Sequence, residues 1–481
     1  MKHIDPKKRP RGARLASITV VLLLGGCAAG PDYKAPKMTV APVFSNGVTN
    51  QPPADEAALA TWWKGFGNPR LDGLIERATA QNHDLRIATA NLNEARALRR
   101  LSKFDLAPTV QANGSYANSL LSKSAAFPGA SRNERQVELY DAGFDATWEL
   151  DLFGRVRRSV QAARAQYEAV EADRLDVLVS VTSEVARNYF ELRGLQNQLA
   201  VARKNVDVQT ETLKITQSRL EGGRGTDFDV ARSRSLLNLT LSTIPPLEGA
   251  AQRAIHRISV LTGQQPAVLE AELSVPEPMP ATLPELAMDS PEAVLRRRPD
   301  IRAAERSLAA ATARIGVATA DLFPRVTFIG GVGFQAQTLA GLGRSGADNW
   351  SFGPRITWAA LDLGRVQARI RVADARSEGA LAVYERTVLQ ALEETEGALV
   401  DYNREQSRRG FLEESAQASQ KAVDLAHQRY EAGSADFLSV LDAERTLLEA
   451  QDRLAASQTR TVTALVTVFK ALGGGVPVAK K

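Results

Sequence analysis

The stretch Val137-Glu-Leu-Tyr-Asp-Ala-Gly-Phe-Asp-Ala-Thr-Trp148 alternates apolar and polar side chains with a period of two. From Tyr140 onward the even positions are apolar and the odd positions are polar or glycine. Side chains on a β-strand point alternately to the two faces of its sheet, so this period predicts a strand with one apolar face. Three other stretches share the pattern, namely 109–116, 326–334 and 350–358.

Two architectures produce such strands. A soluble sheet buries its apolar face against helices, whereas a transmembrane barrel turns that face to lipid and its polar face to a lumen. The alternation alone does not separate them, but aromatic residues near the strand ends favour the membrane. Because four strands do not close a barrel and open strand edges are not tolerated in lipid, a barrel requires an oligomer. The side chains expected to face lipid are Tyr116, Tyr140, Phe144, Trp148, Phe328, Phe334, Trp350, Phe352 and Trp358.

The net charge of the chain lies entirely in residues 1–26. This segment holds six basic residues and one acidic residue, in a chain that has 60 Lys and Arg against 55 Asp and Glu. The remainder has 54 of each and is formally neutral. The estimated pI near 9.2 therefore does not indicate a basic domain, and no nucleic-acid partner is expected.

The same segment has the parts of a secretory signal. A basic stretch is followed by an apolar run over 15–24, which is too short for a permanent membrane span, and by two glycines before Cys27. Residues 24–27 resemble a bacterial lipoprotein box, which implies cleavage before Cys27 and a lipid on its thiol. Ala28 follows in place of the aspartate that retains many such lipoproteins at the inner membrane, so the outer membrane is expected. The alternative is a lone cysteine at the end of an ordinary export signal.

The sequence after Cys27 repeats itself at a displacement near 210 residues. Asp84-Leu-Arg86 recurs as Asp300-Ile-Arg302, and Thr147-Trp148 recurs as Thr357-Trp358. This self-similarity predicts two copies of one structural unit. The expected segments are an N-terminal part (27–70), repeat 1 (71–263), a proline-rich linker that is not regular helix (264–290), repeat 2 (291–475) and a tail (476–481).

Each copy is expected to contain a helix, two strands, a long helix, a turn and a returning helix. The first helices cover 71–104 and 291–322, and each ends before a proline. In copy one the proline-free long helix covers 154–220, and an apolar residue at every seventh position from Leu178 to Leu220 predicts a coiled coil.

Glycine-containing turns at 222–225 and 433–434 predict that each long helix folds back as a hairpin. Pro245-Pro246 predicts either a bend or an end in the first returning helix. The acidic run Glu393-Glu-Thr-Glu396 is expected to be a solvated face.

Several motifs, taken together in their order, carry a family resemblance. They are Cys27–Tyr33, Trp62–Phe66, Trp148–Arg155, Ile244–Glu248, Arg297–Glu305 and Tyr430–Arg445. With them the chain resembles the outer membrane factor lipoproteins of tripartite RND-type efflux systems, the NodT branch of the TolC and OprM channels. The resemblance implies a mixed, mainly α fold: a homotrimer with a twelve-stranded outer-membrane barrel, four strands per chain, continued by a long periplasmic coiled-coil barrel with an equatorial belt.

The resemblance also implies a function and a site. The chain would be the passive exit duct for drugs or other small molecules, passed on by an inner-membrane transporter and a periplasmic adaptor, with no cofactor besides the lipid on Cys27. Leu438, Asp442 and Arg445 would form the periplasmic aperture, and their spacing places them on one helix face. Asp229 and Arg232 occupy related positions in the first copy.

Two other functions remain open from the sequence. A type I protein secretion channel would share these features, and a periplasmic coiled-coil scaffold lipoprotein would use the heptads without a pore. An enzyme is not expected, because the four histidines are far apart in sequence and no metal-ligand spacing or phosphate loop is present.

Overall fold

The computed structural model describes residues 28–47, 55–129 and 131–477. The expected signal peptide, Cys27 and the end of the tail lie outside the described residues. The chain divides into two compact units. One comprises the N-terminal residues through Lys37 with 92–170 and 304–384, and the other comprises 38–91, 171–303 and 385–481.

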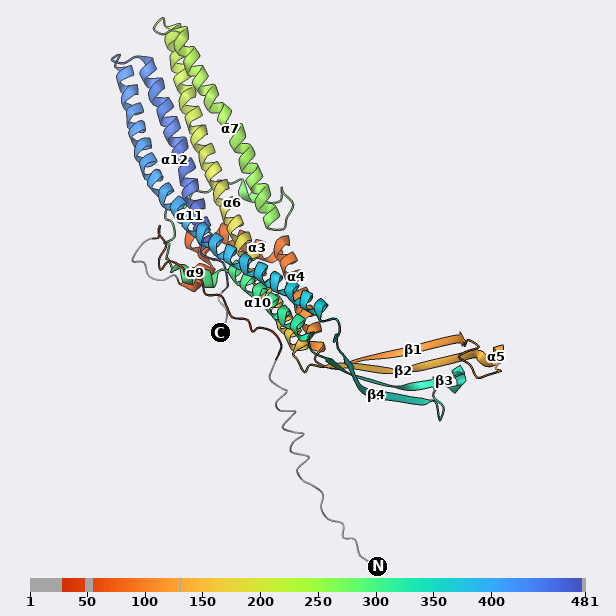
Figure 1. Cartoon of the computed structure of the whole chain (residues 1–481). Coiled ribbons are helices and arrows are strands. Elements are labelled where there is room, and N and C mark those ends of the chain that lie inside the picture. The colour runs from red at the N-terminus through yellow and green to blue at the C-terminus, as the bar shows by residue number, and fades with distance from the viewer. Residues whose placement is uncertain (1–27, 48–54, 130, 478–481) are drawn as a thin grey trace, which may run out of the picture. The chain divides into compact units, whose positions relative to one another are not determined.

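The first unit contains a four-stranded antiparallel sheet in the order β1-β2-β3-β4 (Figure 1). The pairing of β2 with β3 joins the two copies of the repeat, and short helical turns α5 (Arg132–Arg135) and η2 (Leu339–Gly341) lie in the strand connections. The outer edges of β1 and β4 have no partner strand within the part of the chain that is described. The strands are β1 (Thr109–Leu120), β2 (Gln136–Leu150), β3 (Arg325–Ala336) and β4 (Asp348–Thr357).

The register of the sheet collects the apolar side chains on one face. Phe144 lies opposite Val332, which in turn lies opposite Trp350. Tyr116 lies opposite Tyr140, with ring centroids 4.8 Å apart. Directly opposed residues point to the same face, so the expected alternation is confirmed in all four strands.

Both copies make the same tryptophan contact where a strand meets a helix. The indole Nε1 of Trp148 donates to the carbonyl oxygen of Leu106 at 3.1 Å, and that of Trp358 donates to Leu322 at 3.0 Å. Asp151 then caps the long helix that follows β2, accepting from the amides of Val156 and Arg157. These tryptophans therefore have a structural contact of their own at the base of the sheet.

Four long helices form two hairpins. The hairpins lie side by side in the second unit with their turns at the same end (Figure 1). Gly223 and Gly433 have φ of 70° and 72° in the two turns, a left-handed conformation that suits glycine. The helices are α6 (Arg155–Glu221), α7 (Asp227–Leu261), α11 (Leu363–Glu431) and α12 (Phe437–Ala471).

The two prolines at 245 and 246 lie inside a continuous helix, because α7 runs through them to Leu261. A helix end at this point is therefore wrong. Arg203 of α6 pairs with Glu248 at 2.8 Å just beyond the prolines.

The first helix of each copy is broken in two, contrary to the expectation of one continuous helix over 71–104 and 291–322. In copy one α3 (Pro69–Gln81) ends at Asn82, and α4 (His83–Phe104) begins there. The Oδ1 of Asn82 accepts from the amides of Asp84 and Leu85, and its Nδ2 donates to Leu261 at 2.9 Å. Asn82 therefore caps α4 and fixes the break against the end of α7.

In copy two the break falls at Arg298, between α9 (Pro291–Arg297) and α10 (Pro299–Ala320). Arg298 is extended because proline follows it. Its guanidinium binds Asp300 and Glu394, each at 2.7 Å. Glu396 nearby accepts from the amide of Ser45 at 2.6 Å. Glu393 and Glu394 are exposed, as the expected solvated face over 393–396 requires, whereas Glu396 is partly buried and bonds the 45–46 segment.

Aromatic residues of η1 (Trp62–Phe66), which follows α2 (Glu56–Ala60), pack into the largely aliphatic core of the second unit. Trp62 stacks on Phe469 with centroids 5.2 Å apart, and Phe66 contacts Phe190 at 4.6 Å. The linker expected over 264–290 is mostly irregular but contains one helical turn, α8 (Glu270–Leu273).

Replacing Asn82 by alanine tests the break between α3 and α4. The change removes a helix cap and leaves the buried carbonyl of Leu261 without its donor, so we expect a loss of about 2 kcal/mol and a lower thermal midpoint. Asn91→Ala, at an exposed position of α4, is the matched control. Equal midpoints for the two variants would show that Asn82 does not fix the break.

Candidate functional site

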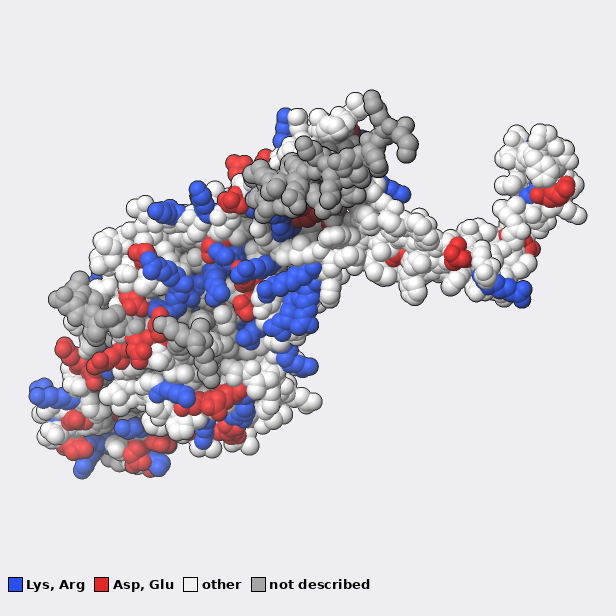
Figure 2. Space-filling model, turned by 90° about the horizontal axis from the view of Figure 1, so that it is seen from below, with Lys and Arg blue, Asp and Glu red and all other residues white. Residues whose placement is uncertain are grey.

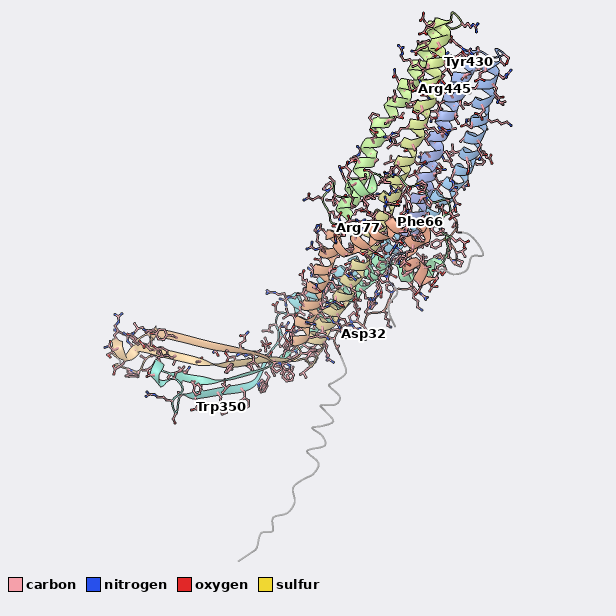
Figure 3. All side chains as sticks on the ribbon, turned by 180° about the vertical axis from the view of Figure 1, so that it is seen from behind. Asp32, Phe66, Arg77, Trp350, Tyr430 and Arg445 are labelled. Carbon is pink, nitrogen blue, oxygen red and sulfur yellow. The ribbon has the colours of Figure 1, made fainter. Side chains whose placement is uncertain are left out.

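The expected aperture residues of copy two lie on the first three turns of α12. Asp442 Oδ1 and Arg445 Nη2 are 2.9 Å apart, and both side chains are more than half exposed. Leu438 is 45% exposed, and Figure 3 shows Arg445 and Tyr430 towards the turn end of their hairpin. An exposed pair of this kind contributes less than about 1 kcal/mol to folding, so it is not needed to stabilise the chain.

The expected residues of copy one are not joined to each other. Asp229 closes a capping box at the start of α7: its Oδ2 accepts from the hydroxyl of Thr226 at 2.7 Å, and its amide donates back to that hydroxyl at 3.2 Å. Arg232 lies over the ring of Phe228, 5.2 Å from its centroid. The carboxylate of Asp229 is thus engaged in starting the helix.

The helix caps define which residues of the two copies are equivalent. Thr226 caps α7 and Asp436 caps α12, which is a displacement of 210 residues. At this displacement Phe228 corresponds to Leu438, and Arg232 corresponds to Asp442. The two copies therefore carry opposite charges at equivalent positions, and Asp229 corresponds to Ser439.

Apolar and aromatic contacts hold the two hairpins together near their turns. Phe437 contacts Tyr430 with centroids 5.4 Å apart and packs in a cluster that includes Leu236 of α7. The guanidinium of Arg219 lies 4.0 Å from the ring centroid of Tyr430. This cluster joins both hairpins within one chain.

A row of polar contacts continues below this cluster, between α6 and α12. Asn197 bonds Gln458 at 3.3 Å, and Asn205 bonds Gln451 at 3.2 Å. The third contact joins the hydroxyl of Thr212 to Glu444 Oε1 at 3.0 Å. Glu444, Gln451 and Gln458 are seven residues apart, so they form one stripe of α12, which we call the polar seam.

The polar seam was not anticipated from the sequence. Its signal was nevertheless present, because three polar residues at heptad spacing interrupt the apolar pattern of α12. Burial raises the pKa of Glu444, although His427 and Thr212 bond to it and act in the opposite direction. Glu444 is thus a buried carboxyl with a raised pKa, two residues from Asp442 of the expected aperture.

The residues that follow Cys27 are fixed to the first unit. The amide of Ala29 donates to the carbonyl of Phe153 at 2.9 Å, and the guanidinium of Arg158 pairs with Asp32 at 2.8 Å. Tyr33 donates to Glu305 at 2.8 Å, and burial raises the pKa of its phenol. A side chain at Gly316 would collide with Ala29, so this close approach depends on glycine.

The strands expose few charges. Figure 2 shows the surface of the strands as mainly uncharged, whereas acidic and basic side chains intermingle over the helices. Eight of the nine aromatic residues expected to face lipid are more than a third exposed, and Trp350 reaches 69%. The ninth, Tyr140, is half-buried beneath its contact with Tyr116.

Neither a metal cluster nor a membrane-spanning helix is found in the described ranges. No three His, Cys, Asp or Glu side chains gather there in a way that could hold a metal ion. No described helix combines the length and the apolar character needed to cross a bilayer.

Comparison with known proteins identifies the family. The model of the outer membrane efflux protein family matches residues 74–264 and 290–474. The chain belongs to this family. It is 31% identical to the solvent efflux pump outer membrane protein SrpC of Pseudomonas putida, over 96% of this chain and 98% of the relative. Nodulation protein T of Rhizobium leguminosarum bv. trifolii is 30% identical over 95% and 97% of the two chains.

A solved structure agrees with this assignment. The outer-membrane channel OprN has a TM-score of 0.87 and 42% sequence identity, over 94% of this chain and 100% of that chain. The resemblance seen in the sequence motifs is therefore confirmed, as is the TolC-like channel fold. The protein is an outer-membrane efflux channel component, which is a transport duct and not an enzyme.

A double-mutant cycle on Thr226 and Asp229 tests the capping box. Each single alanine variant should lower the stability of the first turn of α7 by about 1 kcal/mol, and the double variant should cost no more than either one. Hydrogen exchange of the amides in that turn measures the effect. Asp227→Ala is the control, since this exposed acid lies in the same turn outside the box. Additive effects at 226 and 229 would contradict the assignment.

Proposed function

We propose that three copies of this chain close a twelve-stranded barrel in the outer membrane. The observation that carries the proposal is a sheet with two unpaired edges and one exposed apolar face. Backbone groups at such edges need partners in lipid, and the outer edge of β4 in one copy is suited to pair with β1 of the next. The aromatic residues of the apolar face would then contact lipid, and Asp141 and Asp145 would line the lumen.

The helices support the same assembly. Val206, Leu213 and Leu220 continue the heptad of α6 towards the turn, yet each remains half-exposed in the single chain. A strict heptad stripe is stable when a neighbouring helix covers it. Packing between copies would cover it, and the hairpins would form a tunnel in the periplasm. The N-terminal segment, the 264–290 linker and the tail would form the equatorial belt around it.

A lipid on Cys27 would add a second attachment to the outer membrane. The residues directly after it, from Ala29 to Tyr33, are bonded to the first unit, which also contains the strands. This arrangement supports an anchor placed on the membrane side of the channel. Two or more acyl chains are enough for stable attachment.

The assembled duct would act passively. An inner-membrane RND-type transporter and a periplasmic adaptor would deliver drugs or other small molecules. The relative SrpC is named as the outer membrane protein of a solvent efflux pump. Type I protein secretion would use a similar duct. Membership of the efflux family favours small-molecule export, and it disfavours the scaffold without a pore.

Leu438, Asp442 and Arg445 would close the periplasmic end. Threefold symmetry would turn each residue into a ring, and a ring of carboxylates favours cations. Arg232 stands at the position of copy one that is equivalent to Asp442, so basic and acidic side chains would alternate around the aperture.

The assembly is tested with the purified protein in planar bilayers and by chemical cross-linking. The proposal expects discrete single-channel conductance together with a cross-linked product three times the mass of one chain. A monomer without conductance would overturn it.

The aperture is tested by combining Asp442→Ala with Arg445→Ala. Removing a charged constriction should raise the single-channel conductance. The matched control is Glu449→Ala with Arg453→Ala, another exposed ion pair of α12, and it should leave the conductance unchanged. If both double variants conduct like the parent protein, the aperture does not involve Asp442 and Arg445.

The lipid anchor is tested by replacing Cys27 with serine. We expect the variant to lose incorporation of radiolabelled palmitate, because no other cysteine is present in the sequence. Channel conductance of the purified protein should persist, since the strands and hairpins are unchanged. Labelling of the serine variant would contradict the site.

A further inference from the structure

Glu444 is a buried carboxyl at a junction of three helices. It belongs to α12, and its residue is 5% exposed. Its Oε1 is 3.0 Å from the hydroxyl of Thr212 on α6 and 3.1 Å from Nε2 of His427 on α11. The Oε1 atom of Glu444 therefore links α12 to α11 within the second hairpin, and it also links the second hairpin to α6 of the first.

The second oxygen of this carboxyl is buried without a hydrogen-bond donor among the described residues. On the facing side of α6, Gln209 presents a buried side-chain oxygen that likewise receives no hydrogen bond within the described part. Gln209 lies one turn from Thr212, on the same helix face. The polar seam thus has two buried acceptor oxygens that receive no hydrogen bond within the described residues. A proton on Glu444 would supply a donor, and it would also remove the buried negative charge.

The groups around Glu444 are few. His427 is the titratable group that faces it from α11, α6 offers the neutral Thr212, and α7 contributes the apolar Leu236 to the cluster nearer the turns. On α12 itself, Asp442 and Arg445 pair with each other at the surface. The imidazole of His427, which contacts Glu444, is itself a third exposed.

We propose that Glu444 is a proton-controlled latch between the two hairpins. With a proton on the carboxyl the α6–α12 seam stays packed, and release of that proton to solvent favours separation of the hairpins near their turns. The latch lies in the segment that the proposed function assigns to the closed periplasmic end, and it rests on that assignment for its biological meaning.

The direction of the pH effect follows from burial. Burial raises the pKa of Glu444 in the packed seam above its value in an exposed one. The packed state therefore gains stability at low pH and loses it as pH rises through the raised pKa. The hairpin ends should open more readily at higher pH.

Hydrogen exchange of the purified full chain measures this opening without requiring a conducting pore. Exchange rates of the seam amides, around 209–216 and 440–448, are corrected for the intrinsic effect of pH and compared at about pH 5.5 and about pH 8.5. We expect the corrected opening equilibrium of the parent protein to be larger at the higher pH, because it rises by up to about tenfold per pH unit between the exposed and the packed pKa values.

Three variants separate the latch from general effects of pH. Glu444→Gln keeps the size of the side chain, cannot titrate, and should hold the seam closed at both pH values. Glu449→Gln removes an exposed carboxyl from the same helix and should keep the full pH dependence. His427→Asn removes the charge that lowers the pKa of Glu444, so its transition should move to higher pH.

The outcomes decide the proposal. An unchanged pH dependence in Glu444→Gln would overturn the latch, as would an equal loss in Glu449→Gln. If Glu444→Gln is too unstable to purify, Thr212→Val offers a second variant, which should raise opening at both pH values and retain the dependence. Conductance of the parent protein at a fixed pH tests the proposed duct separately, so failure of the latch and failure of the duct are distinguishable.

Discussion

The unpaired edges of a four-stranded sheet constrain everything else in this protein. Each edge exposes backbone amides and carbonyls, and the apolar face beside them is largely exposed, with no described helix packed upon it. Neither feature is stable alone in water or in lipid. In the proposed trimer, further copies of the same sheet would pair with the edges, and lipid would cover the apolar face.

The alternation of residues was sufficient to locate the strands, because a period of two is a strong local signal when glycines and aspartates occupy the opposite face. The heptad of α6 was equally informative about the hairpins. Family motifs extended these observations to the channel fold, which the solved structure of OprN confirmed. These features depend on residues close in sequence, which is why they could be predicted.

The breaks at Asn82 and Arg298 depend on contacts distant in sequence. Asn82 has the properties of a helix cap, but its donation to Leu261, 179 residues away, decides that the helix ends there. The proline after Arg298 is a local signal for a helix break, whereas the bond between Arg298 and Glu394 is not readable from the sequence. The role of Asp229 is a different case, because its partner Thr226 is only three residues away and this spacing is a local signal of a capping box.

The tryptophan contacts at the base of the sheet have a consequence for how the protein tolerates change. Trp148 and Trp358 make the same bond to Leu106 and Leu322 in the two halves of one chain. Loss of one of these hydrogen bonds would leave the equivalent bond in the other half of the chain. The repeated sequence thus holds each pair of strands to its own helix end by the same indole contact.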